Sequence, residues 1–150
     1  MSYQEKSVTV SLTAYLMIVG YYLFNVFQMF QGGGLVASQL FSLWAVVIVA
    51  GIIVVISGNI LANIILSIVH AIRTGGEESE RFIEDERDKL IDLKGNKVAY
   101  ITFSVGVLLA MLTFVFGQPP LVMFSIIIFF SIAAEIAGNL AQIILYRRGM

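Results

Sequence analysis

Residues 7–72 read SVTVSLTAYLMIVGYYLFNVFQMFQGGGLVASQLFSLWAVVIVAGIIVVISGNILANIILSIVHAI and contain no aspartate, glutamate, lysine or arginine. A helix that crosses a bilayer needs about 20 mainly apolar residues, so this stretch has room for two such helices. Three consecutive glycines at residues 32–34 divide it, because such a flexible run does not continue a helix in lipid. The stretch therefore predicts transmembrane helices at about residues 8–30 and 40–72.

The second half of the chain repeats this organisation. A further stretch without charge runs from Val98 to Glu135 and is broken by the sequence Gly-Gln-Pro-Pro at residues 117–120. Two consecutive prolines remove two backbone donors and force a turn, which predicts spans at about residues 98–116 and 121–146. Over the 150 residues, 59% are apolar and 13% are charged, about half the charge of a typical soluble domain. We therefore expect an all-α integral membrane protein, a bundle of four transmembrane helices surrounded by lipid.

The basic residues predict how the helices are oriented. All nine lysines and arginines lie near the two ends of the chain or between residues 73 and 97: Lys6, Arg73, Arg81, Arg87, Lys89, Lys94, Lys97, Arg147 and Arg148. Because basic residues are retained on the cytoplasmic side of a membrane, both termini and residues 73–97 are expected in the cytoplasm. The span at 40–72 is roughly 50 Å long, so it must tilt or project beyond a hydrocarbon core of about 30 Å.

The two halves share a short phrase. Residues 58–66 read GNILANIIL and residues 138–145 read GNLAQIIL. The likeness suggests two similar helical hairpins with the same orientation, related by an axis along the membrane normal. Chance similarity between two apolar segments is the alternative interpretation.

Polar side chains inside the spans are the candidate functional residues, because they are costly in lipid. Two sets share the helical spacing i, i+4, i+8, i+11: Asn59, Asn63, Ser67 and His70, and Ser131, Glu135, Asn139 and Gln142. The two stripes could form a polar path for an ion or solute, or hydrogen bonds that hold helices together beside small residues such as Ala134 and Gly138. Simple helix contact is the favoured interpretation for the amides. For Glu135, the one acidic residue well inside a span, both interpretations stay open.

The segment at residues 73–97 is predicted to be a charged helical linker. Its block Asp85, Glu86, Arg87 and Asp88 is a candidate contact for a cytoplasmic protein partner. A metal site at these carboxylates is disfavoured because Arg87 and Lys89 compete for them and no calcium-loop spacing is present.

Several classes of function are disfavoured by the composition. The chain has no cysteine, which removes disulfides, thiol nucleophiles and thiolate metal sites. Its net charge of −1 provides no basic stripe for nucleic acid. No set of serine, histidine and carboxylate recurs at a suitable depth, so we expect no enzyme, cofactor or metal.

A family resemblance rests on two phrases. The run FIEDERD at residues 82–88, followed by Ile91, Lys94 and Ala99, and the closing run QIILYRRG at residues 142–149 resemble a prokaryotic family of small predicted membrane proteins, domain-of-unknown-function family 2178. The resemblance implies four helices in a prokaryotic plasma membrane. It implies no activity and no functional residue.

Together these observations favour a non-enzymatic membrane protein that acts through association, either as a homo-oligomer or through a partner at the cytoplasmic linker. The alternative is a small ion or solute transporter or channel that uses Glu135 and the two polar stripes.

Overall fold

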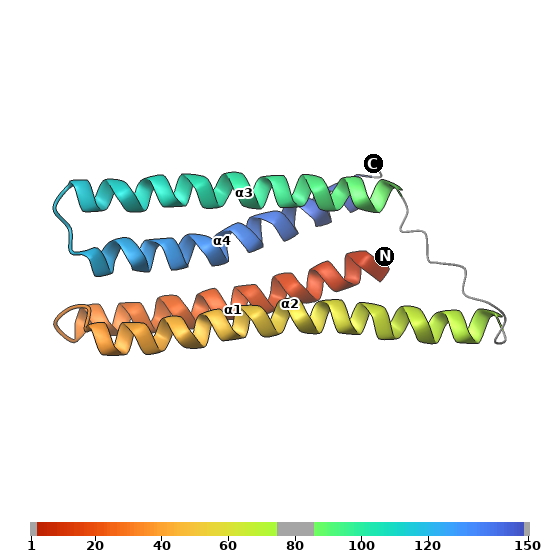
Figure 1. The fold of residues 1–150 in the computed structure, drawn as a ribbon, viewed down its shortest axis with the longest axis horizontal. Helices are drawn as coiled ribbons and strands as arrows, with labels where there is room; N and C mark the ends of the chain where they lie inside the picture. The colour runs from red at the N-terminus through yellow and green to blue at the C-terminus, as the bar shows by residue number, and fades with distance from the viewer. Residues whose placement is uncertain (1–2, 75–85, 149–150) are drawn as a thin grey trace.

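The computed structural model describes residues 3–74 and 86–148, without the side chains of residues 3, 4, 6 and 58–74. The described residues form four helices (Figure 1): α1 (Tyr3–Gln31), α2 (Ala37–Thr74), α3 (Glu86–Val115) and α4 (Pro120–Arg147). Short turns join α1 to α2 and α3 to α4. Each helix contains a stretch that is long and apolar enough to cross a membrane. The prediction of an all-helical chain with four such helices is confirmed.

The two short turns end their helices through glycine. Gly33 and Gly34 have φ angles of 111° and 127°, and the Gly34 N–H donates to the carbonyl oxygen of Met29 at 3.1 Å. Gly117 has a φ angle of 79°, and the Gln118 N–H donates to the carbonyl oxygen of Thr113 at 3.1 Å. Residues with a side chain rarely adopt these φ values, so glycine allows the last carbonyls of α1 and α3 to be capped.

The ends of α2 and α3 differ from the predicted spans. With 38 residues α2 is roughly 57 Å long, and it extends beyond the other helices at the end away from the two turns (Figure 1). The third helix begins at Glu86, so the second half of the predicted linker is continuous with the span at 98–116. Gly95 alone does not interrupt a helix, which explains the continuity. The predicted linker residues 75–85 lie outside the described residues.

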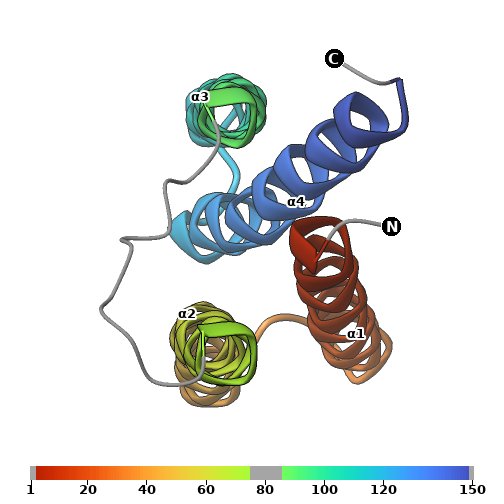
Figure 2. The ribbon, with the colours of Figure 1, turned by 90° about the vertical axis from the view of Figure 1, so that its right-hand side faces the viewer.

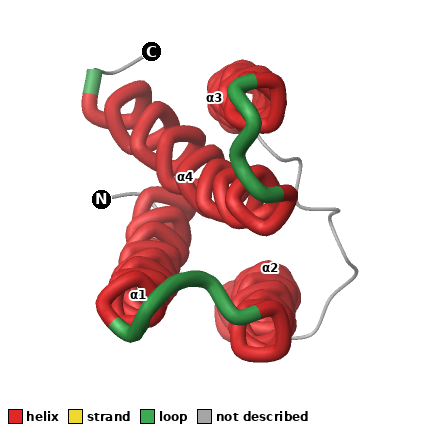
Figure 3. The backbone as a smooth tube through the Cα atoms, turned by 90° about the vertical axis from the view of Figure 1, so that its left-hand side faces the viewer, coloured by secondary structure: helices red, strands yellow, loops and turns green. Residues whose placement is uncertain are grey.

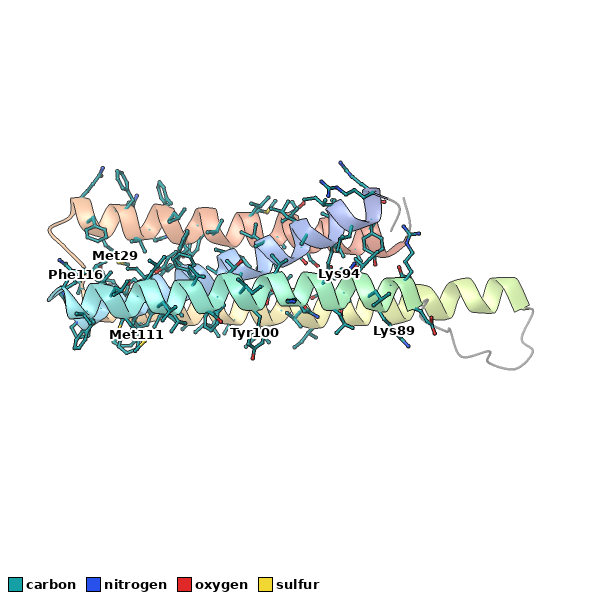
Figure 4. All side chains as sticks on the ribbon, turned by 90° about the horizontal axis from the view of Figure 1, so that it is seen from above. Met29, Lys89, Lys94, Tyr100, Met111 and Phe116 are labelled. Atoms are coloured by element: carbon teal, nitrogen blue, oxygen red, sulfur yellow. The ribbon has the colours of Figure 1, made fainter. Side chains whose placement is uncertain are left out.

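Helix α4 is the centre of the arrangement. It contacts each of the other three helices, and it crosses the bundle obliquely (Figures 2 and 3). Among the described residues, α3 contacts no helix except α4. The α3 side chains opposite that contact are therefore left on the outside, as Tyr100 and Met111 show (Figure 4); the exposed fraction of Tyr100 is 79%.

Small residues allow α3 and α4 to approach closely. Gly106 lies directly against the side chain of Phe130, and Gly138 lies against Gly95 and Ala99. A Cβ atom at Gly138 would be 3.1 Å from the Ala99 Cβ and 3.1 Å from the Gly95 carbonyl oxygen. Helices in lipid gain most of their attraction from such close packing, because apolar surface alone gives no preference for protein over lipid.

The contact of α4 with α1 and α2 is made by larger side chains and includes a buried polar group. Tyr22 is 2% exposed, and its hydroxyl donates a hydrogen bond of 2.7 Å to the carbonyl oxygen of Ser125. Trp44 packs on Phe124 with ring centroids 5.8 Å apart. At the far end, Arg147 Nε lies 3.5 Å from the largely buried carboxylate of Glu5. These contacts fix α1 and α2 against α4.

Candidate functional site

Glu135 lies about halfway along α4, on the side that faces α1 and α2. It lines a cleft of about 350 Å³ formed by all three helices. The walls of the cleft are mostly apolar and come chiefly from α2, including Val47, Gly51 and Val55. Tyr15 of α1 and Ser131 of α4 are the other polar side chains in its lining. The cleft therefore brings the exposed Glu135 near Tyr15 and Ser131, between walls that are mostly apolar.

The hydrogen bonds of the described side chains at the cleft do not include the carboxylate of Glu135. Ser131 uses its hydroxyl hydrogen within its own helix, since Oγ donates to the Ile128 carbonyl oxygen at 2.7 Å. Tyr15 is 6% exposed and lies near enough to Glu135 to interact with it electrostatically. Among the side chains that the structure describes, none forms a hydrogen bond or ion pair with Glu135. With respect to these described side chains, the carboxylate oxygens can accept a proton or a cation that enters the cleft.

This arrangement suits a small, hard cation better than redox or nucleophilic chemistry. Carboxylate, phenol and alcohol oxygens are the ligands that protons and hard cations prefer, and the apolar walls strengthen their attraction for charge. Within residues 3–74 and 86–148, no three histidine, cysteine, aspartate or glutamate side chains lie close enough to share a metal ion. A single carboxylate with neutral oxygens around it can accept one proton or one small cation.

The predicted stripe on α4 is divided between two neighbouring helices. Gln142 does not reach the cleft: it packs on Gly95 of α3, and its Nε2 donates to Asp92 Oδ1 at 3.0 Å. Asn139 lies between Glu135 and Gln142 along α4, and its buried Nδ2 has no acceptor among the described residues. Because α4 crosses the bundle obliquely, side chains one or two turns apart on the same face meet different helices. Asn59 and Asn63 lie in α2, but their side chains are outside the described set.

The candidate partner contact at residues 85–88 takes part in contacts between α3 and α4. Asp85 lies outside the described residues, while Glu86, Arg87 and Asp88 form the first turn of α3. Asp88 hydrogen-bonds with the side chain of Tyr146 at the end of α4. This contact and the Gln142 bond to Asp92 join the charged end of α3 to the end of α4.

Tyr15 and Tyr22 are the contributions of α1 that sequence patterns did not single out. Both are aromatic residues in an apolar helix. In the sequence of such a helix, a tyrosine that bonds to a buried partner looks the same as one that anchors at the membrane surface. Their spacing of seven residues places them on one face of α1, which is a usable but weak signal.

Comparison with protein-family models, curated proteins and solved structures finds no match to this chain. The resemblance to domain-of-unknown-function family 2178 therefore stays a prediction.

Proposed function

We propose that the chain is a multi-pass protein of a prokaryotic plasma membrane, with both termini and the segment between α2 and α3 in the cytoplasm. Four helices of membrane-spanning length support the insertion. The first turn of α1 and the last turn of α4 lie at the same end of the bundle, which suits an even number of crossings (Figure 1). The basic residues at that end support the orientation.

Within this membrane protein, we propose that Glu135 takes up a proton or a small cation, as part of a small transporter or channel without enzymatic activity. The observation that carries the proposal is the carboxylate itself, which lies in a cleft midway along α4 beside Tyr15 and Ser131. An ionisable residue at such a depth is expensive unless it faces a cavity or a partner, and it marks ion pathways in many membrane proteins. A purely structural glutamate would instead be expected to bond to a neighbouring helix.

Ion flux through reconstituted protein tests this function. Purified protein in liposomes should pass protons or a monovalent cation down an imposed gradient, and the Glu135→Gln variant should lose that flux. Glu86→Gln is the matched control, because it makes the same chemical change at an exposed carboxylate in the first turn of α3. Absence of flux for protons, Na⁺ and K⁺ through the unaltered protein, or equal flux through Glu135→Gln, would refute the proposal.

A second candidate function is association with a cytoplasmic partner through the charged end of α3. The observation in its favour is the exposure of Leu90 and Leu93, at 57% and 64%, beside the exposed Glu86. Ile91, by contrast, is buried against the bundle. Crosslinking in cells should then recover a partner with the unaltered protein and lose it after charge reversal at Asp85, Glu86 and Asp88. Recovery of the same proteins by both forms would count against this candidate.

A further inference from the structure

The outer side of the α1–α2 hairpin carries a polar groove near the turn between the two helices. Its volume is about 700 Å³. The polar lining consists of three carboxamides and three hydroxyl groups: Asn25, Gln28, Gln39, Tyr21, Ser38 and Ser42. We call this surface the amide groove.

The amide groove faces away from the rest of the molecule. All of its lining residues come from α1, α2 and the turn between them, and none comes from α3 or α4. Gln28, Gln39, Ser38 and Ser42 are exposed, whereas the neighbouring Tyr22 points into the core and bonds to α4. The groove is therefore a second polar surface, separate from the cleft that contains Glu135.

Part of this groove lies too deep to be satisfied by water at the membrane surface. The apolar part of α1, Ser7–Gln31, has 25 residues and is roughly 37 Å long, about 7 Å more than the hydrocarbon core. Asn25 is six residues from Gln31, or about 9 Å from that end. Even if the whole excess lay at this end, Asn25 would still be within the hydrocarbon. Ser42, five residues inside the start of α2, lies at a similar depth.

The hydrogen bonds within the hairpin leave much of the groove unsatisfied. Asn25 Nδ2 donates to the Tyr21 carbonyl oxygen at 2.8 Å, and Ser42 Oγ donates to the Ser38 carbonyl oxygen at 3.0 Å. The Asn25 Oδ1 and the carboxamides of Gln28 and Gln39 have no hydrogen bond to any described residue. Lipid tails cannot supply a donor to the Asn25 Oδ1, so a polar partner must; Gln28 and Gln39, nearer the helix ends, extend the same polar surface toward the turn.

We infer that the amide groove is the contact face of a homodimer in the membrane. A carboxamide is both donor and acceptor, so this face is complementary to a second copy of itself across a two-fold axis along the membrane normal. The sequence has no charged residue between Lys6 and Arg73, so two copies meet without repulsion. The same absence gives a phosphate headgroup no lysine or arginine to bind. Interhelical bonds between amides are a common means of association in lipid.

This inference rests on the proposed membrane insertion but not on the proposed role of Glu135. A Glu135→Gln variant should therefore dimerise normally even if it loses ion flux, and a monomeric variant could still carry ions. The two proposals fail separately.

Single-cysteine crosslinking tests the dimer, because the chain has no cysteine of its own. Asn25→Cys, Ser38→Cys and Ser42→Cys should crosslink to their own equivalents in dilute proteoliposomes, with a short bismaleimide as the probe. Ser104→Cys is the matched control, since Ser104 is an exposed serine on α3. In the Ser42→Cys background, Gln28→Leu with Gln39→Leu should reduce the crosslinked fraction several-fold, with unchanged Trp44 fluorescence to show that the fold is retained.

Three results would overturn the inference. The first is crosslinking at Ser104→Cys as strong as at the groove positions, and the second is groove crosslinking that vanishes on tenfold dilution with lipid. The third is a monomer by single-molecule photobleaching, with or without a neutral lipid retained in native mass spectrometry. Retained lipid would assign the groove to a headgroup instead of a second copy.

Discussion

The contact between α3 and α4 leads to a prediction at Gly106. A Cβ atom placed there would overlap the Cβ and the nearest ring carbons of Phe130. These atoms lie at the base of the side chain, so rotation of the ring cannot relieve the overlap and the two helices must separate. Overpacking of this kind costs about 1–3 kcal/mol. Since α4 is the one helix that α3 contacts among the described residues, no second contact of α3 offsets this cost.

Gly51→Ala is the matched control for Gly106→Ala. Both substitutions add a methyl group inside a helix, which by itself stabilises a helix by about 1 kcal/mol. Gly51 has open space around its Cβ position, so it should show this gain alone. The difference in stability between the two variants measures the cost of the overlap with Phe130. We expect Gly106→Ala to be less stable than Gly51→Ala by about 1–3 kcal/mol.

Unfolding by SDS in mixed micelles measures the difference, with the fluorescence of Trp44 as the signal. Trp44 is the one tryptophan of the chain and packs on Phe124 of α4, so it reports whether α4 is docked. If Gly106→Ala is as stable as Gly51→Ala, the two helices do not approach as closely as described, and the small-residue account of this contact is wrong.

Two further predictions concern buried hydrogen bonds. Tyr22→Phe should lower the free energy of unfolding by about 1 kcal/mol, because it removes the bond to the Ser125 carbonyl oxygen. Tyr100→Phe, on the exposed face of α3, should change it little, and equal losses in the SDS titration would contradict this prediction. Asp92→Ala should also lower the free energy of unfolding by about 1 kcal/mol, because the buried Gln142 then lacks its acceptor. A double-mutant cycle with Gln142→Leu should show coupling, and strictly additive losses would mean that the bond does not form.

Some features of the site could be anticipated from sequence and others could not. Glu135 stands out in the sequence because it is an acidic residue in an apolar helix, and the cost of burying charge depends only on that local setting. Ser131 could be grouped with Glu135 from its spacing on the same helix, whereas Tyr15 could not, because its role depends on which helix faces α4. The same holds for Gln142, whose spacing matches that of Glu135 although its side chain meets α3.

The sequence by itself determined that the chain forms four long apolar helices separated at the glycine and proline turns. Hydropathy, charge and turn chemistry act over a few residues, so they are readable without a partner helix. Only the tertiary structure decided that α4 lies at the centre, that α3 contacts no other helix among the described residues, and that the charged segment from Glu86 continues into α3. In lipid the exposed and buried faces of a helix are equally apolar, so hydrophobicity does not select the contact. Shape and a few polar bonds select it, and these exist only once the helices have met.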